Sequence, residues 1–214
     1  MTLLVVGFCG GIANATVVTL EFEDLTLGES YSVNDSFTTS GVVITVEEFQ
    51  LYDGFWYIYG DVTVETDTGL GFNTAGGSGN ELGVSGVNLY FDFDTTLSSL
   101  ELLYGDFGGN LNIELNGDFV NFSNFIDIDN TTIGGTSIST LDNGTPGQST
   151  GTLSAVGTIQ SFGIGGAELW IDNVVGVPEP ATVLLLGLGG LALLRKHNGK
   201  SKINGTESRF CASY

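Results

Sequence analysis

Carboxylates are the only side chains in the central part of this chain that could do acid–base or metal chemistry. Between residues 16 and 180 there are 24 Asp and Glu residues and no Lys, Arg, His or Cys. Their absence excludes Ser-His and Cys-His nucleophiles, Schiff-base lysines, and zinc sites built from His or Cys. Two kinds of site remain: a carboxylate pair, as in glycoside hydrolysis, or oxygen ligation of a hard cation such as Ca²⁺.

The charge distribution also limits the partners. All five basic residues follow Leu194, so the region before it is purely anionic. Such a surface repels the phosphate backbone of nucleic acids and anionic lipid headgroups, and it suits cations, neutral sugars or simple solubility. We therefore expect no nucleic-acid partner.

Aromatic residues gather between residues 55 and 59. In a strand, alternation places Trp56 and Ile58 on one face and Phe55, Tyr57 and Tyr59 on the other. One of these faces is expected to pack in the core. The alternative is an aromatic surface that stacks on sugars.

The elements that position these residues are predicted to be short strands. Strand-like runs recur about every ten residues, and turn signals such as Asp53-Gly54, Asn116-Gly117 and Asp142-Asn143-Gly144 separate them. The runs are 17–23, 42–49, 55–66, 87–93, 97–104, 111–115, 137–140, 150–153, 158–163 and 168–174. Residues 104–110 predict a hairpin, and the Gly-rich run 74–80 predicts a loop. The fold class is therefore all-β, an antiparallel β-sandwich.

The N-terminal residues have the pattern of a secretory signal peptide. An apolar run from Leu3 to Phe8 is followed by small residues that end in Ala13-Asn14-Ala15, an A-x-A cleavage pattern. We expect residues 1–15 to be removed and the mature chain to start at Thr16.

The C-terminal pattern is the most specific in the sequence. Residues 177–197 read VPEPATVLLLGLGGLALLRKH, which resembles the PEP-CTERM sorting signal of Gram-negative bacteria. The resemblance implies that Pro178, Glu179 and Pro180 form the sorting motif and that an exosortase-type enzyme cuts near it. The apolar run 181–194 would be ~21 Å long as a helix, a marginal membrane anchor.

The flanks of this run are consistent with such an anchor. Arg195 and Lys196 are expected to stay in the cytoplasm by the positive-inside rule. Pro178 and Pro180 are expected to keep the approach extended and exposed to a processing enzyme.

The first and last predicted strands suggest a second resemblance. The opening Phe22-Glu23-Asp24 and the closing Leu169–Val174 are similar to the terminal strands of galactose-binding-like jelly rolls, a fold shared by many carbohydrate-binding modules. That resemblance implies a structural Ca²⁺ with Glu23 and Asp172 as ligands and Asp24 nearby. The alternative is that these carboxylates are simply solvated.

Together these patterns predict four segments: a signal peptide (1–15), a jelly-roll-like ectodomain (16–176), a sorting signal with a short hydrophobic helix (177–197) and a polar tail (198–214). We expect a non-catalytic protein exported to the cell surface or extracellular matrix, transiently held in the membrane, that binds polysaccharide and Ca²⁺. The alternative is a carbohydrate-active enzyme that uses a carboxylate pair.

Overall fold

Alternating apolar and polar residues fold this chain into two antiparallel sheets around one hydrophobic core. The computed structural model describes residues 16–58, 60–67, 74–144 and 148–180. All of the described strands belong to one compact unit, Ala15–Glu179. This part of the chain contains no α-helix, and its single helical element is the short 3₁₀ helix η1 (Phe125–Ile128). The all-β prediction is confirmed.

The larger sheet has nine strands. Eight follow the order β13-β14-β15-β10-β17-β8-β7-β2, and β1 also pairs with β17. The bounds are β1 (Val18–Leu20), β2 (Ser30–Ser32), β7 (Asp61–Thr66), β8 (Asn80–Ser85), β10 (Leu97–Asp106), β13 (Thr132–Ile133), β14 (Thr136–Asp142), β15 (Ser149–Ile159) and β17 (Leu169–Pro178). One edge of β17 pairs with β8 through residues 169–171 and with β1 through residues 174–176. Asp172 and Asn173 therefore lie between these two partners.

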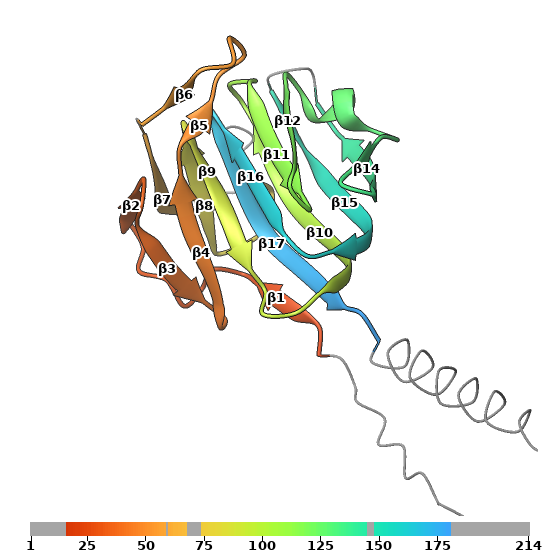
Figure 1. Cartoon of the computed structure of the whole chain (residues 1–214). Helices are drawn as coiled ribbons and strands as arrows, with labels where there is room; N and C mark the ends of the chain where they lie inside the picture. Colours follow the sequence, from red (N-terminus) through yellow and green to blue (C-terminus); the bar gives the residue numbers. More distant parts are fainter. Residues whose placement is uncertain (1–15, 59, 68–73, 145–147, 181–214) are drawn as a thin grey trace, which may run out of the picture. The chain divides into compact units, whose positions relative to one another are not determined.

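The smaller sheet has six strands in the order β12-β11-β16-β9-β4-β3. They are β3 (Ser36–Thr39), β4 (Val42–Glu47), β9 (Val87–Asp92), β11 (Leu111–Leu115), β12 (Asp118–Phe122) and β16 (Phe162–Gly166). A separate two-stranded hairpin is formed by β5 (Phe49–Gln50) and β6 (Trp56–Tyr57). Figure 1 shows β4, β9, β16 and β11 side by side in one layer, with β17, β10 and β15 in the layer behind them.

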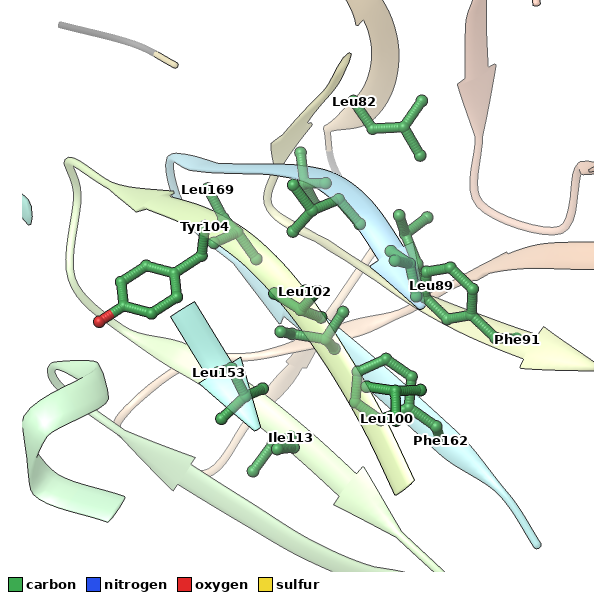
Figure 2. Close-up of a cluster of buried hydrophobic side chains, with 14 of the residues drawn as sticks. Leu82, Leu89, Phe91, Leu100, Leu102, Tyr104, Ile113, Leu153, Phe162 and Leu169 are labelled. Carbon is green, nitrogen blue, oxygen red and sulfur yellow. The ribbon is translucent and has the colours of Figure 1, made fainter. Parts of the chain in front are cut away.

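The core lies between the two sheets, because each sheet turns its apolar residues toward the other. Leu82, Leu102 and Leu169 come from the larger sheet, and Leu89 and Phe162 come from the smaller one. All five are fully buried. Figure 2 shows these side chains meeting between the ribbons of the two sheets. The structure is therefore sandwich-like.

Several of the strand and hairpin predictions are wrong in detail. The run 55–66 is interrupted after Tyr57 and resumes at Asp61, and Gly60 between them has a φ of +98°. Residues 104–110 do not close a hairpin, because β10 pairs with β15 and β17 whereas β11 pairs with β12 and β16. This segment instead carries the chain from one sheet to the other. Sequence patterns reveal strands, but they do not reveal which strands pair.

Several predicted segments lie outside the described residues, namely the signal peptide 1–15, the hydrophobic run 181–194 and the tail 198–214. Among the residues that are described, no helix has the length and apolar character needed to cross a bilayer.

Tyr104 links three strands of the larger sheet. Its ring crosses Gly151 of β15, and its hydroxyl donates a hydrogen bond to Asp142 of β14 at 3.3 Å. On the core side the ring stacks on Phe125 with a centroid distance of 3.7 Å. A β-carbon at position 151 would lie 2.1 Å from the Leu141 carbonyl oxygen and 2.6 Å from the Tyr104 hydroxyl oxygen. Only glycine leaves room for the ring to cross this strand.

We predict that Gly151→Ala lowers the free energy of unfolding by about 1–3 kcal/mol, because the added methyl group would clash with the Leu141 carbonyl and the Tyr104 ring. Thermal denaturation measures the effect. Thr152→Ala, on the same strand but the opposite face, is the control and should change stability by less than about 1 kcal/mol. Equal melting temperatures for the two variants would contradict this packing.

Candidate functional site

The face of the smaller sheet that points away from the core carries a polar surface. Along β9, Leu89 and Phe91 enter the core, so Asn88 and Tyr90 point to the other side. Strand register places Glu47 beside Asn88 and Thr45 beside Tyr90. This face, which we call the outer face, is where the candidate site lies.

Tyr90 crosses its neighbouring strand in the same way as Tyr104. Its hydroxyl donates a short hydrogen bond to Glu114 of β11, two strands away. Between them lies Gly163 of β16, where a β-carbon would be 2.8 Å from the Tyr90 ring. The ring is therefore held flat against the sheet.

A chain of asparagine side chains crosses the outer face in the next row. Asn112 donates to the Oδ1 of Asn88 at 3.1 Å, and Asn121 donates to the Oδ1 of Asn112 at 2.7 Å. At its two ends the chain reaches backbone carbonyls, those of Glu48 at 2.6 Å and Gln50 at 3.0 Å. It thereby fixes the start of the β5–β6 hairpin to the sheet.

The β5–β6 hairpin presents aromatic side chains to solvent. Phe55 is 68% exposed, Trp56 48% and Tyr52 84%. Trp56 contacts Phe119 of β12, with ring centroids 5.1 Å apart. The expectation that one face of residues 55–59 packs in the core is wrong for the described residues, because Phe55, Trp56 and Ile58 are exposed and the hairpin pairs only with itself.

A groove of about 420 Å³ lies between this hairpin and the outer face. Two aromatic side chains, Trp56 and Tyr90, and two carboxylates, Glu47 and Glu48, line it. The remaining lining comes from Val33, Asn34, Thr45 and Val46. Its size falls within the range of about 300–1,000 Å³ that is usual for small-molecule sites.

The groove is acidic. Burial raises the pKa of Glu47, and the negative charges of Glu114 and Glu48 raise it further. Among the described residues, no donor forms a hydrogen bond with the carboxylate of Glu47 or Glu48. Aromatic rings beside free carboxylate acceptors are suited to stacking on a sugar ring and accepting its hydroxyl or amine protons.

The predicted calcium ligands do not converge as a set. The Asp24 carboxylate accepts hydrogen bonds from Thr39 Oγ1 at 2.6 Å and from the Ser40 amide at 2.8 Å. Glu23 and Asp172 do lie close enough for the charge of Glu23 to raise the pKa of Asp172. Within the described ranges, no group of three or more His, Cys, Asp or Glu side chains is arranged to hold a metal ion.

Glu23 and Asp172 instead bind the Gly-rich loop 74–80 through its backbone. The backbone amide of Asn80 donates a hydrogen bond to Glu23 at 3.0 Å, and the backbone amide of Ser78 donates one to Asp172 at 3.2 Å. Glu81 contributes a third contact, accepting the Ala75 amide at 2.8 Å. These carboxylates hold the loop against the larger sheet.

Two of these carboxyl groups are fully buried, and this raises their pKa values. Burial raises the pKa of Glu81 to about 7, and the charges of Asp67 and Asp172 add to the effect. Burial likewise raises the pKa of Asp172 to about 6. A third buried carboxyl, Asp106 at the end of β10, has its pKa raised to about 6 by burial and by Asp142. Glu81 is therefore substantially protonated near neutral pH, whereas Asp106 and Asp172 favour the protonated form only below about pH 6.

The C-terminal end of β17 leads directly into the predicted sorting motif. Pro178 is the last residue of the strand, pairs with Leu97 and is buried. The Glu179 amide donates to the carbonyl of Thr96 at 3.0 Å, and Glu179 accepts the Thr158 hydroxyl at 2.8 Å. Pro180 is exposed. The prediction that Pro178 is exposed is therefore wrong, because the sheet extends further than the strand pattern indicated.

Comparison with known families identifies this region. A family model described as the PEP-CTERM protein-sorting motif matches residues 176–196. This chain carries a PEP-CTERM sorting motif. No curated protein and no solved structure matches the chain.

The PEP-CTERM motif implies an exported protein that transits the membrane of a Gram-negative-type bacterium and is processed by an exosortase. The match covers the end of β17 and the residues that follow it. The described residues thus include the first part of the motif.

We predict that the mature protein ends at or after Glu179 and lacks residues 181–194. Cleavage before Pro178 requires the end of β17 to separate from β10, whereas cleavage beyond Glu179 leaves the sheet intact. Mass spectrometry of the C-terminal peptide of the protein from its own host makes the measurement. A mature C-terminus upstream of Pro178, or an intact 181–194 segment, would contradict the prediction.

We also predict that the domain is less stable at about pH 8 than at about pH 5. A carboxyl group whose pKa is higher in the folded than in the unfolded protein contributes most to stability at pH values below its unfolded pKa. This stabilisation is lost as the pH rises through the folded pKa, which is here about 6 to 7. Glu81→Gln copies the protonated form, so it should melt several degrees above the natural protein at about pH 8 and close to it at about pH 5.

The control for general charge repulsion is Glu21→Gln, since Glu21 is exposed. Both substitutions remove one negative charge, but only the buried one should flatten the dependence of melting temperature on pH. The same flattening in both variants would show that net charge, rather than burial, causes it.

Proposed function

We propose that this protein is a non-catalytic component of the bacterial surface or extracellular matrix that binds polysaccharide in the groove beside the β5–β6 hairpin. The exposed Trp56, at the wall of an acidic groove, is the observation that carries the proposal. Exposed aromatic side chains on a soluble domain are costly to keep in water and are common where sugars stack. Export through the sorting motif would bring the groove to the extracellular polysaccharide.

The sorting motif supports a temporary anchor in this proposal. Residues 181–194 would hold the protein in the membrane until an exosortase-type enzyme removes them. The released domain would then remain at the surface or enter the matrix.

The enzyme alternative needs two carboxyl groups about 5–9.5 Å apart in a cleft, one of them free to transfer a proton. The candidate pair is Glu47, which lines the groove, and Glu114, which does not line it but is near enough to raise the pKa of Glu47. However, Glu114 already accepts the Tyr90 hydroxyl, and the ring of Tyr90 lies between the two strands that carry the pair. This arrangement favours binding over catalysis.

Calcium binding stays a prediction centred on Glu23 and Asp172. What supports it is the accumulation of carboxylates around the loop 74–80, with Asp67 and Glu81 close by, in a domain with no basic side chain. Further oxygen ligands would have to come from backbone carbonyls or water, because Asp24 is bound to Thr39 and Ser40.

For the polysaccharide proposal, we predict that Trp56→Ala reduces binding to responsive glycans at least about tenfold on a glycan array, because a stacking surface is lost. Tyr52→Ala is the matched control, since Tyr52 is more exposed but does not line the groove. Equal binding by both variants would contradict the assignment of the site. An array with no responsive glycan would contradict the function.

For the calcium prediction, the melting temperature in millimolar Ca²⁺ should be higher than in EDTA. A hundredfold excess of Ca²⁺ over its Kd corresponds to a stabilisation of about 2.7 kcal/mol. Asp172→Ala should abolish the difference. Mg²⁺ at equal concentration controls for charge screening. A shift that Mg²⁺ reproduces, or that Asp172→Ala retains, would refute this site.

A further inference from the structure

We infer that the groove selects glycans whose sugar units carry protonated amines. This inference rests on the proposed glycan-binding function and adds the chemical class of the ligand. It follows from three features of the groove: its charge, its free acceptors and its aromatic walls.

The charge of the groove is uncompensated. Glu47 and Glu48 line it directly, and Glu114 is near enough to raise the pKa of Glu47. No Lys, Arg or His occurs between residues 16 and 180, so the domain has no side chain that could neutralise them. A polysaccharide that carries carboxylates or sulfates would be repelled, whereas a cationic sugar would relieve the repulsion among the three groups.

The acceptors of the groove differ from several carboxylates of the larger sheet. Asp61 and Glu101 each accept a hydrogen bond from a side chain of the neighbouring strand, and Glu65 accepts one from Trp170, two strands away. Glu47 and Glu48 accept none from any described residue. An ammonium group of a sugar offers three donors and a positive charge, which matches two carboxylates better than a neutral hydroxyl does.

The aromatic walls suit the same ligand. Trp56 and Tyr90 both line the groove next to these carboxylates. Aromatic rings stack on the apolar face of a sugar, and they also attract a cation positioned over the ring. The Tyr90 ring is fixed by its hydrogen bond to Glu114, so it needs no ordering when a ligand binds.

The test compares two oligosaccharides of equal length and linkage, β-1,4-linked glucosamine and β-1,4-linked N-acetylglucosamine. They differ only in whether the amine is charged or acetylated. Isothermal titration calorimetry on the full chain in mild detergent, at low salt and about pH 6, gives both affinities. We expect the glucosamine oligomer to bind about tenfold more tightly.

Four variants test which residues cause the preference for the glucosamine oligomer. Glu47→Gln should lose most of it, and Glu48→Gln gives an independent second variant. Glu101→Gln removes one charge from an exposed position on the larger sheet and should keep the preference. Trp56→Ala should weaken the binding of both oligomers.

The other possible outcomes would each contradict a different part of the inference. Equal affinities, or tighter binding of the acetylated oligomer, would overturn the amine preference and leave glycan binding standing. If Glu47→Gln retained the preference for the glucosamine oligomer, or if Glu101→Gln lost it as much as Glu47→Gln, the preference would reflect general attraction of a cation to the acidic protein. Absence of binding by both oligomers, together with an unresponsive glycan array, would overturn the inference and the proposed function together.

Discussion

The absence of basic side chains from residues 16–180 is the constraint on which the rest of this structure depends. A carboxylate in a folded protein usually obtains a hydrogen-bond partner or an opposite charge, because desolvating it alone is costly. Here opposite charges do not exist within the domain, so the donors are neutral: backbone amides, hydroxyl groups, and the side chains of Trp170 and Asn130. Asp118 accepts a hydrogen bond from the backbone amide of Gly134, and Asp129 accepts one from the backbone amide of Thr140. Asp61 accepts one from the hydroxyl group of Ser30.

The same constraint accounts for the local architecture. Tyr90 and Tyr104 each cross a glycine to reach a carboxylate two strands away, one on the outer face of the smaller sheet and one at the edge of the core. The loop 74–80 is held by three carboxylates through its own amides. Glu47 and Glu48 accept no hydrogen bond from the described residues, and in the proposed function their negative charge is available to a ligand. In the groove, therefore, these two carboxylates lack, among the described residues, the hydrogen-bond donors that tyrosine hydroxyls and loop amides provide to other carboxylates of the domain.

Much of this fold follows from alternation in the sequence. β9 and β11 match their predicted ranges within one residue, because each alternates strictly and turn residues bound it. β8 was not predicted, since Glu81 and Gly83 make Asn80–Ser85 look like the end of a glycine-rich loop. Glu81 is in a strand because the loop above it supplies donors for its carboxyl group, and that contact is invisible in the sequence.

The candidate site was less predictable than the fold. Of the two aromatic residues of the groove, the sequence pattern singles out only Trp56, and hydrophobicity alone favours a core position for one face of residues 55–59. The Asp53-Gly54 turn signal was the useful clue, because it makes β5 and β6 a short hairpin that has no further strand to cover it. Glu47 and Glu114, far apart in sequence, approach each other only through the register of β4, β9, β16 and β11.

The central claim is that neutral donors and protons, rather than opposite charges, accommodate the carboxyl groups of this domain. Carbon-13 NMR titration of the side-chain carboxyl groups tests it most directly. The account predicts that Glu81 titrates with a pKa of about 7 and that Asp106 and Asp172 titrate at about 6. Titration of all three at the ordinary values of about 4 for exposed carboxyl groups would contradict it.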